Sequence, residues 1–284
     1  MTKTNARILM AAVMVARGTS FIFSKTLMGS MGALNILGLR FLTAFLILLV
    51  IFRKKLKELD KENLKGGIIL GLLYTVCMIC EMTGLKTIET GTSSFIENTA
   101  VVIVPFYELI LFKVLPKKIT IISAFITLIG VGFLTLTGDA TINVGILFAI
   151  AAALSYGACI MYTTHVANTC DPIIIGILQL GSMGLVCMIL SFVFESPTLP
   201  QSSNQWAMLL MLVLVCSVFG FTFQPLAQKY MTATEAGMWA TLNPLSACTI
   251  GILFAGEPYG VFKLLGGCLI LLGIVMLIKG DGEK

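Results

Sequence analysis

The chain alternates long apolar runs with short polar stretches, and each apolar run is about as long as a bilayer is thick. A membrane-spanning helix needs about 20 mostly apolar residues, and the sequence offers ten such runs. The stretches between them are short, so the loops are short. We therefore predict an all-α integral membrane protein whose ten transmembrane helices cover residues 7–28, 33–52, 66–85, 91–113, 118–137, 143–164, 173–194, 205–227, 233–254 and 258–278.

The composition agrees with this pattern and excludes several other classes of protein. Of the 284 residues, 57% are hydrophobic and only 12% are charged, and the mean hydropathy is +0.99. Soluble domains have roughly 45–50% apolar and about 25% charged residues. The chain has too little polar surface for a soluble enzyme, a disordered chain or a nucleic-acid-binding domain, and ten spans leave no room for a separate soluble domain.

Residue types that bind metals or drive transport with ATP do not form a site in this sequence. Seven of the eight cysteines lie inside apolar runs, where cysteine packs as a small hydrophobic residue. Cys77-x-x-Cys80 has no second pair or neighbouring histidine, and His165 is the only histidine. A phosphate-binding Gly-x-x-x-x-Gly-Lys-Ser/Thr motif is also missing. We predict no metal site, no cofactor and no direct use of ATP.

Basic residues divide unequally between the two sides of the predicted membrane protein. If the N-terminus is cytoplasmic, the outer side holds only Lys86 and Lys263. Cytoplasmic loops are enriched in Lys and Arg, so we predict a multi-pass protein of the cell membrane with both termini inside. The fourteen inner basic residues are Lys3, Arg7, Arg53, Lys54, Lys55, Lys57, Lys61, Lys65, Lys113, Lys117, Lys118, Lys229, Lys279 and Lys284.

The two halves of the chain resemble each other. The stretch AAVMVARG in the first predicted helix matches AAALSYG in the sixth at an offset of 139 residues, and Pro105 meets Pro244 at the same offset. Each half holds five predicted helices, an odd number, so the second half is inverted relative to the first. Inverted repeats place a substrate site near the middle of the membrane. We predict two five-helix repeats, residues 1–138 and 139–284, with that site between them.

Several of these features resemble a known family. Gly18 ends the small-residue motif of the first helix, Lys25 and Arg40 follow, and Thr-Ala-Thr-Glu-Ala precedes Asn243-Pro244 and Gly256-Glu257-Pro258. Their order is similar to that in the EamA branch of the drug/metabolite transporter superfamily. The resemblance implies ten helices around a central cavity, in an exporter or permease of amino acids or other small metabolites. Arg17 departs from the Trp that is common there, as Lys117-Lys118 departs from a Gly-Glu pair.

Besides charges near the span ends, six charged residues within the predicted spans are candidates for function. A charge at the bilayer centre costs about 2.5–3.5 kcal/mol even on the lenient insertion scale, so these residues need partners or water. Lys25, Arg40, Glu81 and Glu97 lie close to the outer helix ends, where we expect them to meet in one layer, and Arg17 lies near the middle. The six are Arg17, Lys25, Arg40, Glu81, Glu97 and Glu108.

The carboxylates of the fourth predicted helix are candidates for coupling and gating. A carboxylate away from water is stabilised by a proton or a cation, so we expect Glu97 to carry a proton or hold a substrate ammonium group. Glu108 is eleven residues further on, on the same face of a continuous helix, and Pro105 between them predicts a kink. Glu108 is either a gate residue or a partner of Lys113.

Other readings of these charges stay open. Lys25 either joins the charged layer or extends its side chain to the membrane surface. Arg40 either contacts substrate or forms a structural pair with Glu81 or Glu97, and Glu81 itself is a further candidate for the substrate site.

The second half supplies neutral candidates for the substrate site. Trp239 and Asn243 are four residues apart, so they share a helical face directly before the predicted kink at Pro244. An aromatic ring beside an amide suits an organic substrate with apolar and polar parts. Packing of Trp239 against lipid or a neighbouring helix is the alternative. Three further candidates are Tyr156, Gln179 and Gln224.

Together these features predict a secondary transporter of small zwitterionic metabolites, such as amino acids, that works by alternating access. Its partners are a small-molecule substrate and the lipid bilayer, with proton coupling through Glu97 and no nucleic acid. A membrane enzyme acting on lipids would need clustered catalytic His, Asp or Ser residues. A channel or a structural subunit would show unsaturable flux or none. A ten-helix chain can enclose a cavity alone, so no oligomeric state is predicted.

Overall fold

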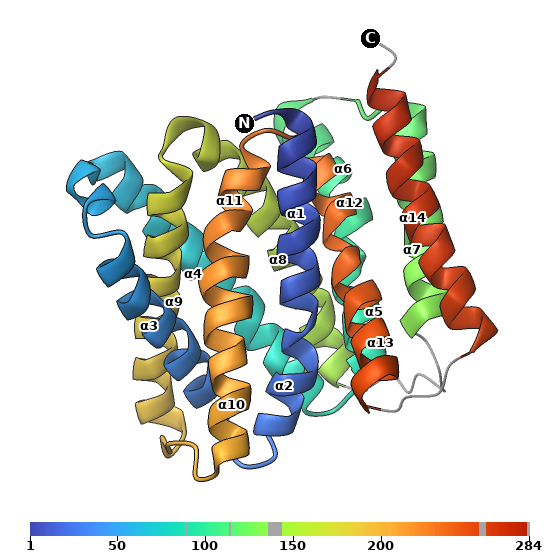
Figure 1. Ribbon diagram of the computed structural model, residues 1–284. Coiled ribbons are helices and arrows are strands. Elements are labelled where there is room, and N and C mark those ends of the chain that lie inside the picture. The colour runs from blue at the N-terminus through green and yellow to red at the C-terminus, as the bar shows by residue number, and fades with distance from the viewer. Residues whose placement is uncertain (89, 114, 136–143, 256–259, 283–284) are drawn as a thin grey trace.

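A computed structural model describes residues 1–88, 90–113, 115–135, 144–255 and 260–282 (Figure 1). The helices in these residues are α1 (Lys3–Gly18), α2 (Ser20–Leu27), α3 (Ala33–Ile51), η1 (Lys55–Glu58), α4 (Lys61–Leu85), α5 (Thr90–Asn98), α6 (Ala100–Phe112), α7 (Lys118–Thr135), α8 (Val144–Thr169), α9 (Pro172–Phe194), α10 (Ser203–Met211), η2 (Leu212–Phe221), α11 (Thr222–Gln228), α12 (Ala233–Ala240), α13 (Leu242–Ala255) and α14 (Val261–Gly282).

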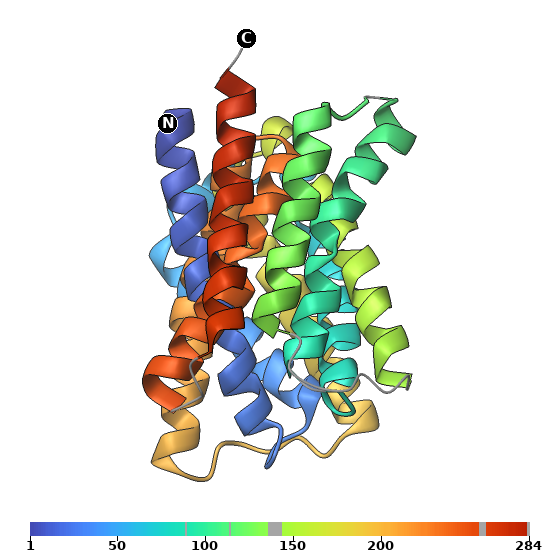
Figure 2. The same cartoon turned by 90° about the vertical axis from the view of Figure 1, so that its right-hand side faces the viewer.

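Helices from the two halves of the chain are interleaved in one bundle. Helix α3 packs along α9, α4 packs between α8 and α9, and α7 packs along α14. The start of α1 and the end of α14 lie at the same end of the bundle, called the N-terminal end below (Figures 1 and 2). The predicted repeat boundary at residue 138 and the Gly256-Glu257-Pro258 motif lie outside the described residues.

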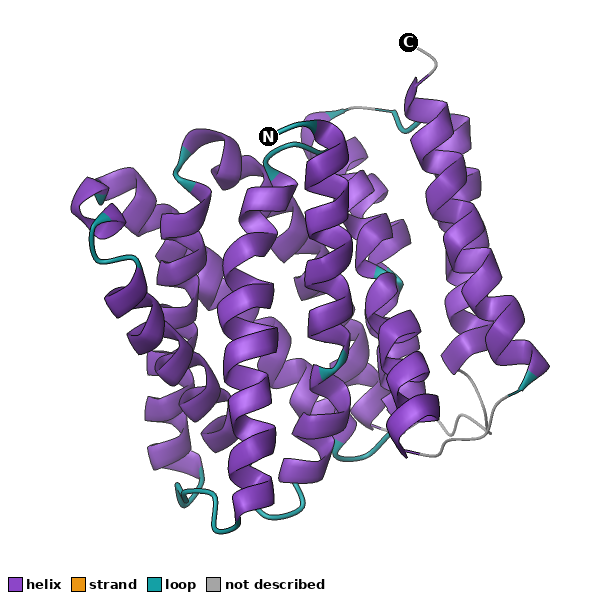
Figure 3. Ribbon diagram, viewed as in Figure 1, coloured by secondary structure: helices purple, strands orange, loops and turns teal. Residues whose placement is uncertain are grey.

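Helix length and composition agree with a membrane protein. In the described residues, eight segments are long and apolar enough to cross a bilayer, and none is a strand (Figure 3). The apolar part of α7 is shorter, and α12 and α13 are two short helices placed end to end. The all-helical membrane class therefore agrees with the prediction, whereas the count of ten crossings and their orientation stay predictions.

Three of the helical segments are interrupted at a threonine. Thr19 separates α1 from α2, Thr99 separates α5 from α6, and Thr241 separates α12 from α13. Each hydroxyl donates a hydrogen bond to the carbonyl three residues earlier, at 2.8, 2.6 and 2.6 Å. A side chain that binds nearby backbone competes with regular helical hydrogen bonding and bends the helix.

Two of these interruptions come before the two prolines at which the sequence predicts kinks. The breaks at Thr99 and Thr241 come before Pro105 and Pro244, which lie inside α6 and α13. Pro244 occupies the first turn of α13, where the missing N–H has no intrahelical partner to lose. Glu97 and Glu108 consequently belong to different helices, so they do not share the face of one continuous helix.

Polar side chains fasten α3 to α9 at both ends of the pair. Glu195, directly after α9, accepts hydrogen bonds from the backbone N–H groups of Leu34 at 3.2 Å and Asn35 at 2.9 Å. At the opposite end, Lys55 pairs with Asp171 at 2.8 Å. Asp171 also caps α9, because its carboxylate accepts from the first backbone N–H groups of that helix. This inter-half pair is thus held at both ends.

Candidate functional site

Arg17 occupies the centre of the bundle at the end of α1. Its side chain is buried and donates a hydrogen bond from Nη1 to Oε1 of Gln224 on α11. Gln224 in turn donates from Nε2 to the hydroxyl of Tyr74 on α4, at 2.9 Å. The amide of Gln224 therefore holds Arg17 in place while both of its own polar ends are satisfied.

Two glycines allow Arg17 to reach this position: Gly18, the next residue in the chain, and Gly220 on η2. A Cβ atom on Gly18 would lie 2.4 Å from the carbonyl oxygen of Asn243, and one on Gly220 would lie 2.7 Å from Cγ of Arg17. Both separations are too short for a side chain. The close approach of α1 to α13 and to η2 therefore depends on these two glycines.

Aromatic rings surround the Arg17 guanidinium. Its Cζ lies 4.1 Å from the ring centroid of Phe221, 5.8 Å from that of Tyr74 and 5.7 Å from that of Tyr156. Such a contact stabilises a desolvated cation by about 2 kcal/mol or more. The rings therefore offset part of the cost of burying the charge.

Arg40, on α3, is the second buried arginine of the centre. Its Nε donates to the hydroxyl of Ser217 at 2.7 Å, and that hydroxyl donates to the carbonyl of Leu212 at 2.9 Å. Its Cζ lies 4.9 Å from the ring centroid of Phe41 and 5.7 Å from that of Phe221. Ser217 and Phe221 both belong to η2, a π-helix. The π-helix is rare, and π-helical turns are frequent at functional sites.

Glu81 on α4 and Glu97 on α5 complete a central charge group with Arg17 and Arg40. Glu81 interacts electrostatically with both arginines, and Glu97 interacts with Arg17 and Glu81. Both carboxylates are buried, with 7% and 5% of the residue exposed. Among the described residues no direct ion pair joins these four side chains. Oε2 of Glu97 has no hydrogen-bond partner in that part of the chain.

The structure brings together only some of the predicted charges. Arg40, Glu81 and Glu97 meet as predicted, and Arg17 joins them, but Lys25 is exposed and lies outside the group. Of the two positions that the sequence left open for Lys25, the structure shows the second, with the long side chain at the surface. Arg40 is hydrogen-bonded to neutral Ser217, a partner that the sequence did not suggest.

Four of the predicted neutral residues bury polar atoms that lack a partner. The hydroxyl of Tyr156, Oε1 of Gln179, Nε1 of Trp239 and Oδ1 of Asn243 have no hydrogen bond within the described ranges. Tyr156 interacts electrostatically with Arg17 and Glu97. Trp239 packs against the buried core. Buried polar groups are normally hydrogen-bonded, so these atoms mark places where a ligand or water would bind.

A second set of charges, the terminal ion cluster, lies at the N-terminal end of the bundle. Glu235, at the start of α12, pairs with Arg7 at 2.6 Å and with Lys3 at 3.5 Å. Sequence reasoning missed Glu235, although Thr232-x-x-Glu235 has the spacing of a helix-capping box. Thr232 does accept a hydrogen bond from the backbone N–H of Glu235 at 3.1 Å.

Glu108, on α6, contacts the same end of α12. Its carboxylate accepts hydrogen bonds from the backbone N–H and the hydroxyl of Thr234. This contact differs from the pairing with Lys113 that the sequence left open. Two carboxylates, one on α6 and one on α12 itself, therefore hold the start of α12 in place.

Comparison with known proteins decides the family. The model of the EamA-like transporter family matches residues 4–136 and again residues 143–279. The chain belongs to the EamA-like transporter family. An uncharacterized transporter of Archaeoglobus fulgidus is 26% identical over 95% of this chain and 94% of its own length. The uncharacterized transporter YoaV of Bacillus subtilis is 27% identical over 84% and 85%.

The fold of this EamA-like transporter is also found in solved structures. One crystal structure superposes with a TM-score of 0.83 and covers 99% of both chains at 13% sequence identity, which shows a shared fold and no more. The family and its relatives make the protein a multi-pass membrane transporter, as predicted.

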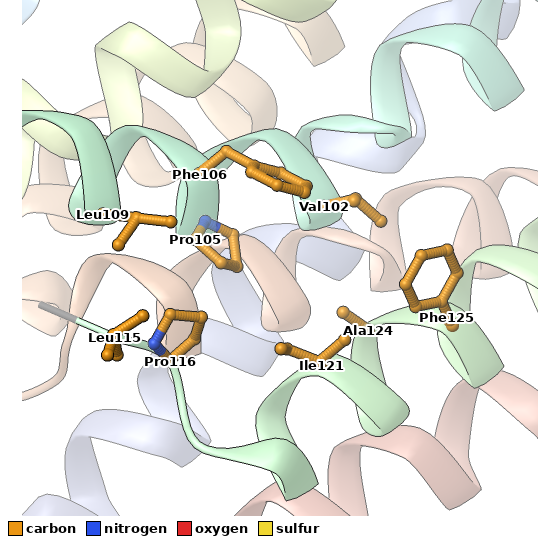
Figure 4. A pocket seen from close by; sticks show the side chains of 9 residues that line it. All are labelled: Val102, Pro105, Phe106, Leu109, Leu115, Pro116, Ile121, Ala124 and Phe125. Atoms are coloured by element: carbon orange, nitrogen blue, oxygen red, sulfur yellow. The ribbon is translucent and has the colours of Figure 1, made fainter.

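An apolar pocket on the EamA-like transporter lies apart from the central charge group. It has a volume of about 160 Å³ and lies between α6 and α7, as Figure 4 shows. Phe106 and Leu115 in its wall are 56% and 79% exposed. Its lining suits a lipid chain at the bundle surface rather than a polar substrate. The lining residues are Val102, Pro105, Phe106, Leu109, Leu115, Pro116, Ile121, Ala124 and Phe125.

Proposed function

We propose that this EamA-like transporter carries small zwitterionic metabolites, specifically amino acids or related compounds, across the cell membrane. The observation that carries the proposal is the central charge group, in which two guanidinium and two carboxylate groups are buried without direct ion pairing among the described residues. Burying a charge is costly unless it is paired. A ligand with charges of both signs would supply the missing partners.

Each end of a zwitterion has a suitable partner in this group. A guanidinium has five N–H donors in a planar fork that matches a carboxylate, and Arg17 gives one of them to Gln224. Glu97 offers the unpartnered Oε2 to a substrate ammonium. Tyr156 lies within electrostatic range of both charges. Asn243 contacts Gly18, beside Arg17.

Alternating access would move the two inverted five-helix repeats, residues 1–138 and 139–284, about this central site. With ten crossings and both termini inside, the terminal ion cluster lies at the cytoplasmic end and closes it through α1 and α12. Glu235 and Trp239 are one helical turn apart on α12. Release of Glu235 from Arg7 would therefore move a helix that also carries a residue of the candidate substrate site.

Proton coupling through Glu97 is part of the proposal. Glu97 is 5% exposed and has one oxygen without a hydrogen bond among the described residues. A proton and a substrate ammonium would compete for this carboxylate, which is the exchange that proton-driven transport requires. An imposed proton gradient should therefore change the flux through the wild-type protein and not through Glu97→Gln.

The direct test is counterflow of labelled amino acids in proteoliposomes that contain the purified protein. We expect saturable counterflow that falls in Glu97→Gln and in Trp239→Ala, whereas the exposed Lys25→Gln control keeps the wild-type rate. Saturable counterflow separates a carrier from a channel. No counterflow for any amino acid, or equal rates in Glu97→Gln and the wild type, would overturn the proposed substrate class or site.

A further inference from the structure

The two buried arginines share one aromatic ring. The guanidinium carbon of Arg17 lies 4.1 Å from the ring centroid of Phe221, and that of Arg40 lies 5.7 Å from the same point. The distance between the two guanidinium carbons therefore cannot exceed the sum of these two distances. At such a separation in a buried site the two positive charges repel each other.

A zwitterion with one carboxylate leaves this repulsion in place. Its carboxylate would bind Arg17 and its ammonium group would bind Glu97, so Arg40 would keep only the contacts that the protein provides. Among the described residues these are one hydrogen bond from Nε to the neutral hydroxyl of Ser217 and the faces of two aromatic rings. Glu81 interacts with Arg40 electrostatically but, within the described chain, forms no direct ion pair with it.

The geometry of Arg40 suits a second carboxylate. Since Ser217 takes Nε, the edge formed by the two terminal nitrogens is the part of the guanidinium that can bind a carboxylate through two parallel hydrogen bonds. Such bonds are about 2.7–2.9 Å long. Two carboxylates separated by a short carbon chain would therefore fit between guanidinium groups as close as those of Arg17 and Arg40.

We propose that Arg40 forms a second anion subsite, so that the preferred substrate is an amino dicarboxylate: one carboxylate on Arg17, the ammonium on Glu97 and the second carboxylate on Arg40. This inference rests on the proposed function and narrows its substrate class. Arg40 then determines specificity, while Arg17 and Glu97 bind the groups that all amino acids share.

The test compares counterflow of aspartate and glutamate with that of alanine and leucine. We expect the wild-type kcat/KM to favour the dicarboxylates by at least about tenfold, since one desolvated bidentate ion pair exceeds 1.4 kcal/mol. Arg40→Gln should lower the ratio of aspartate to alanine by a similar factor, and Arg40→Lys by less. The ratio should stay at the wild-type value in Lys25→Gln, which changes an exposed charge outside the site.

Each outcome decides between the two proposals. The second subsite is refuted if the wild type carries alanine and leucine with the same kcat/KM as aspartate, or if Arg40→Gln slows all four substrates equally. Amino acid transport would stand in either case. If no amino acid is carried, the proposed function itself fails. Ser217→Ala supplies a milder second variant, because it frees Nε without removing the charge. It should lower the ratio of aspartate to alanine by about two- to threefold, and an unchanged ratio would count against the subsite.

Discussion

Two groups of charges in the same bundle are satisfied in different ways. In the terminal ion cluster, Glu235 is paired directly with Arg7 and Lys3, and the start of its helix is held by Glu108 through Thr234. In the central charge group, Arg17 and Arg40 contact neutral side chains and aromatic rings, and no direct ion pair reaches Glu81 or Glu97 within the described residues.

The difference separates a structural role from a binding role. Charges that are already paired gain little from a ligand, and they stabilise the closed arrangement of the helices that carry them. Charges that are buried but unpaired are costly to keep, and a ligand that pairs them recovers part of that cost. The central charge group is therefore the place to expect substrate, and the terminal ion cluster is the place to expect a closed gate.

The largest effect should come from removing the charge of Arg17. Arg17→Gln removes the guanidinium that we assign to the substrate carboxylate, and truncating one partner of a buried charge pair costs about 2–5 kcal/mol. We expect substrate-dependent counterflow to fall at least about 30-fold. Arg17→Lys keeps the charge but lacks the planar fork, so counterflow should fall less in this variant. Transport by Arg17→Gln at the wild-type rate would place the substrate elsewhere.

Glu97→Gln should change the coupling as well as the rate. The amide keeps the shape of the side chain but cannot take up a proton or pair with an ammonium group. We expect transport to become insensitive to an imposed proton gradient and to fall about tenfold, the effect of losing about 1.4 kcal/mol of binding free energy. Glu108→Gln is the matched control, since Glu108 binds Thr234 at the start of α12, away from the central charge group. Gradient-dependent flux that persists in Glu97→Gln would assign the proton to another group.

The terminal ion cluster should respond in stability rather than in substrate affinity. Glu235→Gln leaves Arg7 without the carboxylate at 2.6 Å, where the glutamate side chain is 4% exposed. We expect the free energy of unfolding to fall by about 2 kcal/mol, seen as a lower Tm in detergent. The double variant Arg7→Glu with Glu235→Arg should recover part of this loss. A double variant less stable than either single one would argue against the pair.

The smallest expected effect is the pH dependence of the stability that the Lys55–Asp171 ion pair contributes at one end of the α3–α9 pair. Burial alone would raise the pKa of Asp171, but hydrogen bonds from Lys55 and from the N–H groups of Ile174 and Ile173 hold it below the ordinary value of 3.8. The stabilisation from ionised Asp171 is therefore present at neutral pH. It is lost as the pH falls from 3.8 through the lower pKa of the folded protein.

Asp171→Asn tests this sign directly. Asparagine keeps the cap on α9 but loses the pair with Lys55, so the protein should lose about 0.5–1 kcal/mol at neutral pH. The difference from wild type, followed as Tm against pH, should shrink toward zero in acid. A difference that does not change with pH would show that the charge of Asp171 contributes nothing to stability.

The sequence predicted the helical membrane fold because length and hydropathy are local properties that one chain displays directly. It also placed Arg40, Glu81 and Glu97 in one charged layer, since few partners exist for a charge inside a bilayer, but it set Arg17 apart from that layer, near the middle of the membrane. It did not reveal Tyr74, Phe221 or Ser217, which contact the arginines from distant helices. An aromatic residue or serine in an apolar helix has the same pattern whether it faces a guanidinium or lipid.

The helix interruptions show a second limit of pattern reasoning. Pro105 and Pro244 are visible breakers, yet the chain breaks at Thr99 and Thr241, where a hydroxyl returns to the backbone. Threonine does so only where the surrounding packing permits, so its position alone does not predict the break. Two positions stayed open for Lys25 for a related reason, because depth along a helix does not say which way a flexible side chain points.

The most direct test of the central claim is the change in Tm that amino acid ligands produce in matched variants. A ligand that binds only the folded protein raises its stability. The account predicts that aspartate raises the Tm of the wild type and of Arg7→Gln alike, and leaves that of Arg17→Gln and Glu97→Gln unchanged. An equal rise in Arg17→Gln and in the wild type would contradict it, because the unpaired charges would then not be the substrate site.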